Sequence, residues 1–273
     1  TTYLFYYIII LLGCDYMKKL DSKEALSLLF DGVIENPKEL SLDKNRWVRH
    51  SIYVGIAAGR IARAINNNYA NYTYFKEYLD EFGPLDDDYA TALGYIHDIG
   101  RKISHPLHTT EGYKLLCELG HEEEARATLT HSFIDNDVNN SADGITGEDR
   151  KKAIIEYLNS IQLTAYDNIV QLCDLFCLET GFTTVERRLY DIVSRKGVYE
   201  NTLAHFYKTL ELKRRFEPDD DYIEILSKEL DKTIDDFSLY ALFPEIPREE
   251  LASQNEDRNK LLRLINNSKI KSL

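Results

Sequence analysis

The chain has 273 residues, of which 44% are hydrophobic, enough for one large domain or two small ones. Its formal net charge of −13 argues against binding to long nucleic acids, because that affinity comes from lysine and arginine side chains that neutralise phosphates. A small phosphorylated substrate needs only a local positive site and is compatible with this charge. The four cysteines lack zinc-finger spacing, which predicts a reducing, cytoplasmic environment.

The first sixteen residues differ from the rest of the chain. Residues 3–12 form an unbroken apolar run, about half of the ~20 residues that cross a bilayer. Residues 11–14, Leu-Leu-Gly-Cys, resemble a lipoprotein cleavage site, but no basic residue precedes the run, as a secretory signal requires. The only methionine is Met17, and two lysines follow it. We therefore predict that residues 1–16 are upstream read-through and that the protein does not bind membranes. A true anchor and a packed first strand are the alternatives.

From Ser22 onward the sequence predicts helices almost throughout, so the predicted fold class is all-α. The predicted helices include residues 43–66, 72–82 and 148–160. On the first of these helices, one apolar face carries His50, which therefore points inward. Taken alone, such a histidine is more often a hydrogen-bonded core residue than a ligand.

The sequence of residues 90–102 predicts a helix of small and apolar residues, with His97 and Asp98 in its last turn. Gly100 suits the left-handed residue that closes a helix. Burying a polar group without a partner costs about 2–7 kcal/mol, and burying a charge costs more. A metal ion removes that cost, because imidazole nitrogen and carboxylate oxygen are both good ligands. A hydrogen-bonded His-Asp pair at a helix end is the alternative.

Three further polar side chains fall on apolar or small-residue faces of other predicted helices. His108 begins one helix, and Gly112 leaves room there for a close neighbour. His131 follows small residues, and Asp174 shares a face with apolar side chains. Helical bundles build metal sites from inward side chains on facing helices. Four histidines and two carboxylates suit two divalent transition-metal ions, among Fe, Mn, Co, Ni and Zn, with Asp98 as the bridge.

In this order and spacing, the sequence resembles the HD superfamily of metal-dependent phosphohydrolases. The resemblance covers residues 47–178, with the order His50, His97-Asp98 and Asp174. His108 in His-x-x-x-Gly-Tyr and His131 in Thr-His-Ser-Phe match the two-metal branch, similar to bacterial HD hydrolases of dinucleoside polyphosphates. The residues after His131 differ from the HD-GYP pattern, which makes a cyclic dinucleotide an unexpected substrate.

The resemblance implies an HD-domain helical bundle that hydrolyses a phosphate ester or anhydride of a small metabolite, with a nucleotide as the first expectation. It implies one ion held by His50, His97, Asp98 and Asp174, and a second held by Asp98, His108 and His131. A metal-activated water would attack phosphorus. Asp98 and Arg101 are the expected catalytic residues. We expect Arg101, Lys102 and Arg187 to bind the substrate. Arg188, next to Arg187, is a further candidate, and a solvated helix face is the alternative role of both arginines. His105 is the substitute ligand if His108 is not one.

The predicted domains are an HD domain at residues 17–198 and an additional C-terminal helical extension at 199–273 that packs on the core. Its expected packing positions are Leu226, Leu230 and Phe237, whereas Leu210, Leu212 and Phe216 interleave with basic residues. Partner binding is the alternative role. Two other functions stay open: an HD-type di-iron oxygenase and a non-catalytic metal-binding sensor. The sequence does not predict an oligomeric state.

Overall fold

The computed structural model describes residues 19–68, 73–142, 145–217 and 239–253, and six single residues between 256 and 267. Helices dominate these residues, and the all-α prediction is confirmed. The α-helices are α2 (Ser22–Phe30), α3 (Arg46–Asn68), α4 (Thr73–Phe82), α5 (Asp87–Ile96), α6 (His108–Glu118), α7 (Glu122–Thr130), α8 (Glu148–Ser160), α9 (Ala165–Asp174), α10 (Val185–Lys196), α11 (Thr202–Arg214) and α13 (Arg248–Ala252).

The remaining regular elements are short. Strands β1 (Cys177–Leu178) and β2 (Gly181–Phe182) form an antiparallel pair between α9 and α10. The 3-10 segments are η1 (Pro37–Ser41), η2 (Asp43–Asn45), η4 (Ile99–Lys102), η5 (Ile134–Asn136) and η7 (Tyr240–Leu242).

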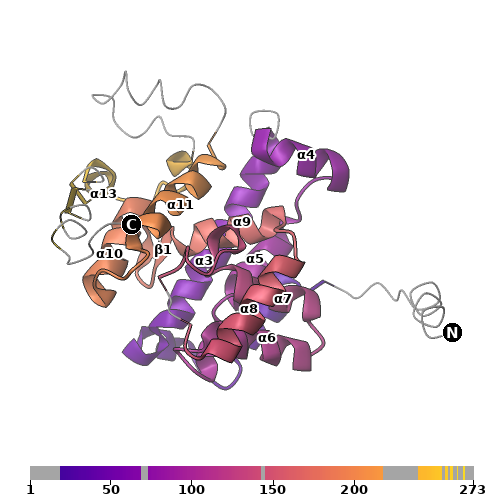
Figure 1. The fold of residues 1–273 in the computed structure, drawn as a ribbon. Coiled ribbons are helices and arrows are strands. Elements are labelled where there is room, and N and C mark those ends of the chain that lie inside the picture. Colours follow the sequence, from indigo (N-terminus) through magenta and orange to yellow (C-terminus); the bar gives the residue numbers. More distant parts are fainter. Residues whose placement is uncertain are drawn as a thin grey trace.

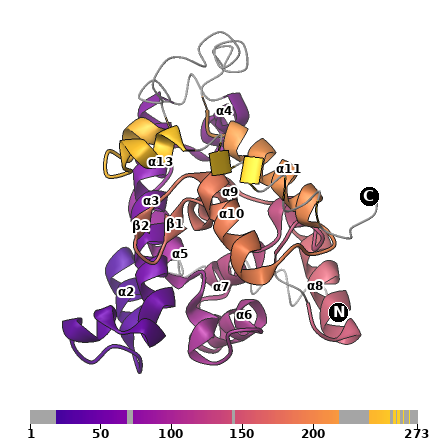
Figure 2. The ribbon, with the colours of Figure 1, turned by 90° about the vertical axis from the view of Figure 1, so that its left-hand side faces the viewer.

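The long helix α3 runs through the middle of the molecule and packs against α5 and α9 (Figure 1). In that view α10, α11 and α13 lie on one side of it, and α6, α7 and α8 lie on the other. Figure 2, turned by 90°, shows α2 beside α5 and α6 beside α7. The predicted helix 148–160 has the predicted bounds. The helix predicted at 43–66 begins later, because Asp43–Asn45 forms a 3-10 turn before α3.

Glycines bring two pairs of these helices unusually close together. A Cβ on Gly94 of α5 would lie 2.5 Å from the Cα of Gly55 on α3, so these two backbones touch. A Cβ on Gly112 of α6 would lie 3.1 Å from the Thr128 side chain on α7, which confirms the close neighbour expected there. These contacts pack α3 tightly against α5 and α6 tightly against α7.

The expectation that Gly100 closes its helix in the left-handed conformation is wrong. Helix α5 already ends at Ile96, and Gly100 lies inside η4 without a positive φ. A Cβ at this position would lie 2.0 Å from the backbone oxygen of His108 and 2.4 Å from the backbone nitrogen of Gly112. Glycine is therefore needed for the close approach of α6, not for its conformational freedom.

The described part of the C-terminal extension shares the main hydrophobic core. Leu212 and Phe216 are buried, together with Phe243 and Leu251, in the same cluster as Val54 of α3. The expected packing positions Leu226, Leu230 and Phe237 lie outside the described residues, as do residues 1–16. Within the described residues, no helix combines the length and the apolar character that crossing a membrane requires.

Candidate metal centre

The structure brings together the six side chains that the sequence predicts as metal ligands. Each comes from a helix or from the residues directly after one. His50 lies in α3, His97 and Asp98 follow α5, His108 begins α6, His131 follows α7 and Asp174 ends α9. Asp174 is partly buried, and the other five residues are buried.

Asp98 lies at the centre of this cluster. Its Oδ1 is 3.3 Å from His108 Nε2 and 3.7 Å from His131 Nε2. Its Oδ2 is 3.8 Å from His97 Nε2. One group of potential ligand atoms is therefore formed by Asp98, His108 and His131, and another by His50, His97 and Asp98, each within 4.8 Å. Asp98 is the residue that the two groups share.

Asp174 extends the group that contains His50. Its Oδ1 is 2.8 Å from His50 Nε2 and 3.9 Å from His97 Nε2. Two ligand atoms that are each about 2.1 Å from one ion and at right angles lie about 3 Å apart, so the His50–Asp174 pair has a suitable separation.

The histidine rings are held so that Nε2 faces the centre. Nδ1 of His97 lies 2.7 Å from the backbone oxygen of Gly94, and Nδ1 of His131 lies 3.1 Å from that of Ala127. His108 Nδ1 makes the same kind of contact with the oxygen of His105, at 3.0 Å. Each Nδ1–H therefore donates to a carbonyl and leaves the Nε2 lone pair for the cluster. Metal-binding histidines are commonly oriented in this way.

The charges in the cluster also suit a metal. Burial alone would raise the pKa of Asp98, but Arg101 and the neighbouring histidines hold that pKa well below its usual value. Burial lowers the pKa of His131 to about 3, so this imidazole is neutral at pH 7. Among the described residues, His97 Nε2 and Asp98 Oδ1 are buried without a hydrogen-bond partner. The Ser132 hydroxyl lies 3.0 Å from His131 Nε2, a contact that a bound metal would replace. An ionised carboxylate beside imidazole lone pairs fits a divalent transition metal.

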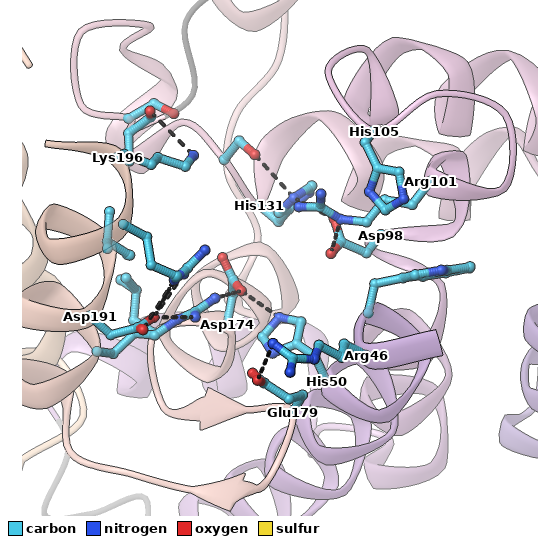
Figure 3. Close-up of a pocket in the computed structure, with 18 of the residues that line it drawn as sticks. Arg46, His50, Asp98, Arg101, His105, His131, Asp174, Glu179, Asp191 and Lys196 are labelled. Atoms are coloured by element: carbon cyan, nitrogen blue, oxygen red, sulfur yellow. Dashed lines mark hydrogen bonds and ion pairs between the residues drawn. The ribbon is translucent and has the colours of Figure 1, made fainter. Parts of the chain in front are cut away.

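A cavity of about 530 Å³ opens onto the cluster, and four of its residues line it: His50, Asp98, His131 and Asp174. Figure 3 shows Asp98, Arg101, His105 and His131 on one side of this cavity, with Asp191 and Lys196 across from them. Although the chain is strongly acidic, basic side chains from α3, η4 and α10 line the cavity: Arg46, Arg101, Arg188, Arg195 and Lys196.

Two of the expected substrate-binding residues are not at this cavity. The Lys102 ammonium donates instead to the backbone oxygen of Leu28 and, at 2.6 Å, to that of Asp31, at the end of α2. Arg187 donates a hydrogen bond to Asp257 at 2.8 Å and is not among the described residues that line the cavity. Arg101 does line the cavity, and its Nε–H donates to Asp98 Oδ2. His105 also lines it, outside both groups of potential ligands.

Of the neighbouring candidates Arg187 and Arg188, Arg188 lines the cavity. Successive residues of a helix are rotated by about 100°, so neighbours face different directions. Only 14% of the Arg188 side chain is exposed, and its guanidinium lies 3.6 Å from Asp174 and 3.2 Å from Asp191. The spacing of Arg188, Asp191 and Arg195 on one face of α10 was the signal available in the sequence.

The helical fold and this cluster define an all-α protein whose buried histidines and carboxylates can hold divalent metal. Comparison with protein families gives the more particular result. Residues 47–177 match the family model described as HD domain. HD domains form a superfamily of metal-dependent phosphohydrolases, and both the match and the cluster fit it. No curated protein and no solved structure matches the chain.

Proposed function

We propose that this protein is a phosphohydrolase that uses two divalent metal ions to cleave a phosphate ester or anhydride of a small cytoplasmic metabolite, most simply a nucleotide. One observation carries the proposal. Asp98 lies between two sets of imidazole nitrogens at a cavity lined by basic side chains, and its Oδ1 has no hydrogen-bond partner among the described residues. A carboxylate in this position can bridge two ions.

The two ions would share the six side chains. His50, His97, Asp98 and Asp174 would hold one ion, and Asp98, His108 and His131 the other. Bound ions would supply charge for the phosphate oxygens and lower the pKa of a coordinated water toward neutrality.

The basic residues of the cavity have separate tasks. Arg101, beside Asp98, can donate charge-assisted hydrogen bonds to the phosphoryl group under attack. Arg188 lies on the other side of the centre, next to Asp174. Arg188 also lines the cavity, so its guanidinium is placed to donate to a substrate oxygen.

Phosphate release tests the proposed activity. Purified protein loaded with Mn, Fe or Co is incubated with phosphate monoesters, nucleoside di- and triphosphates and dinucleoside polyphosphates. We expect phosphate release that requires metal and disappears in Asp98→Asn. Metal binding without turnover of any substrate would indicate a sensor instead. Oxygen consumption without phosphate release would indicate oxygenase chemistry.

Neighbouring arginines provide a matched test of substrate binding. We expect Arg188→Met to raise KM at least about tenfold, because a charge-assisted hydrogen bond to phosphate is lost. Arg187→Met removes the same charge one residue earlier, where the side chain pairs with Asp257, and should change KM less than about twofold. Steady-state kinetics on the best substrate measures both values. Equal effects of the two variants would remove Arg188 from the binding site.

A further inference from the structure

A second cavity, of about 440 Å³, lies among α4, α5, α7, α8 and α9. It shares no lining residue with the metal cavity, and Figure 1 shows α5, α7 and α8 on the side of α3 that faces away from α10 and α11. Its volume falls within the range of small-molecule sites, about 300–1,000 Å³. This cavity has no role in the proposed hydrolase activity.

Four tyrosines from four helices line this cavity: Tyr78, Tyr89, Tyr157 and Tyr166. The rings of Tyr89 and Tyr166 are 5.1 Å apart and nearly perpendicular, at 83°. Burial raises the pKa of Tyr166 to about 12 and also raises the pKa of Tyr89, so both phenols are neutral at physiological pH. Neutral aromatic rings present an electron-rich face, which attracts cations.

A cation already occupies part of this cavity. The Lys19 ammonium lies 4.8 Å from the centre of the Tyr89 ring and 5.9 Å from the centre of the Tyr166 ring. Both distances are within the range of a cation–π interaction, about 6 Å. Lys19 is exposed, so its side chain can leave without unfolding the core.

The charges around the cavity favour a cation as well. Arg126 is matched by Asp167, which accepts two of its hydrogen bonds at 3.0 and 3.1 Å. Glu122 and Glu123 are exposed residues in the first turn of α7, and among the described lining residues the one cation left to balance them is Lys19. If Lys19 withdraws, two carboxylates and a tyrosine-lined cavity remain for another cation.

We propose that this cavity binds a small organic ammonium ion, which displaces the Lys19 side chain from the tyrosine rings. The site is independent of the metal centre. Loading the protein with Mn is therefore expected to leave the affinity for the ammonium ion unchanged.

Calorimetric titration of the full chain tests the proposal with two probes of similar shape. Tetramethylammonium carries the positive charge, and tert-butanol is its neutral counterpart. We expect tetramethylammonium to bind with a dissociation constant in the millimolar range or below, and at least about tenfold more tightly than tert-butanol. Equal affinity for both probes, or no binding of either, would overturn the proposal.

Substitutions locate the binding site. Lys19→Ala removes the internal competitor and should tighten tetramethylammonium binding about tenfold, whereas Lys23→Ala removes an exposed lysine outside the cavity and should have little effect. Tyr89→Leu should weaken binding at least about tenfold, and Tyr89→Phe, which keeps the ring, should not.

A further variant avoids the buried core. Glu123→Gln changes an exposed side chain and should weaken binding several-fold without altering the melting temperature. If binding persists unchanged in both Glu123→Gln and Tyr89→Leu, the ammonium ion binds elsewhere and the proposal is wrong.

Discussion

Asp98 and Asp167 are two buried aspartates with opposite surroundings. Their exposed fractions are 3% and 4%, and each accepts a hydrogen bond from an arginine. Asp167 also accepts hydrogen bonds from the Thr164 backbone N–H at 2.7 Å, the Thr164 hydroxyl at 2.7 Å and the Thr130 hydroxyl at 2.8 Å. Asp98 Oδ1 accepts none from the described residues.

The neighbours explain the difference. Hydroxyl and amide donors satisfy Asp167, which caps α9 and holds Arg126 in place. The histidines around Asp98 carry their protons on Nδ1, which points away from it. The carboxylate oxygens therefore face Nε2 lone pairs, and both groups are hydrogen-bond acceptors. Such an arrangement is costly until a cation enters it. A buried carboxylate is therefore a candidate ligand when its acceptors remain unfilled, and a structural residue when its own chain fills them.

The largest expected effect is that of Asp98→Asn on metal binding and activity. We expect phosphate release to fall at least about a thousandfold, which corresponds to about 4 kcal/mol, because the bridge between the ions is lost. Elemental analysis should find less metal than in the wild type. Free metal at 100 times its Kd should stabilise the wild type by about 2.7 kcal/mol and leave the variant unchanged.

Without metal, Asp98→Asn should alter the free energy of unfolding by less than about 1 kcal/mol. The variant loses the ion pair with Arg101, but it also removes a charge from among acceptor nitrogens, so the two effects oppose each other. Urea unfolding of the chelator-treated proteins measures this difference. Wild-type metal content in the variant would exclude a bridging role for Asp98.

The second prediction concerns Asp167, where substitution should affect stability and leave metal binding unchanged. We expect Asp167→Asn to lower the free energy of unfolding by about 3 kcal/mol, because it breaks a buried ion pair and weakens the cap of α9. Metal content and KM should stay at their wild-type values, because Asp167 does not line the metal cavity. Urea unfolding and elemental analysis on one preparation test both parts. Loss of metal from the folded variant would contradict the assignment of a structural role.

The contrast between these aspartates also separates what the sequence predicts from what needs coordinates. The six candidate ligands were predictable because each stands at helical spacing on an apolar or small-residue face, in the order of the HD superfamily. Arg187 and Arg188 were not separable, because a shift of one residue in helical phase exchanges them. The tyrosine-lined cavity was not predictable either, since its four rings come from segments that only tertiary packing brings together.

The close approach at Gly100 shows the same limit. A glycine after a helix usually indicates a left-handed residue, and the sequence contains no sign that the backbone of α6 lies against it. Lys102 is a related case, because the carbonyls that it binds lie in the last turn of α2 and directly after it, about seventy residues earlier in the chain.

Glu186 is a third buried carboxylate to compare with Asp98 and Asp167. Its substitution has the smallest expected effect of the three. Its exposed fraction is 7%, and it accepts hydrogen bonds from Lys213 at 2.9 Å and Tyr240 at 3.3 Å, which joins α10 to the C-terminal extension. Burial alone would raise the pKa of Glu186, but the Lys213 ammonium lowers it below its usual 4.5. A carboxyl with a depressed pKa stabilises the folded state above pH 4.5, and that contribution is lost as the pH falls through the folded-state pKa.

We therefore expect Glu186→Gln to lower the free energy of unfolding by about 2 kcal/mol at pH 7. The difference from the wild type should shrink as the pH falls below 4.5, because the wild type then loses the same charge. Urea unfolding at pH 7 and at acidic pH measures the effect, with the exposed Glu200→Gln as a control that should change stability by less than about 0.5 kcal/mol. Glu186, like Asp167, accepts hydrogen bonds from other side chains of the protein. Metal content should therefore remain unchanged. A pH-independent difference would mean that Glu186 acts through packing and not through its charge.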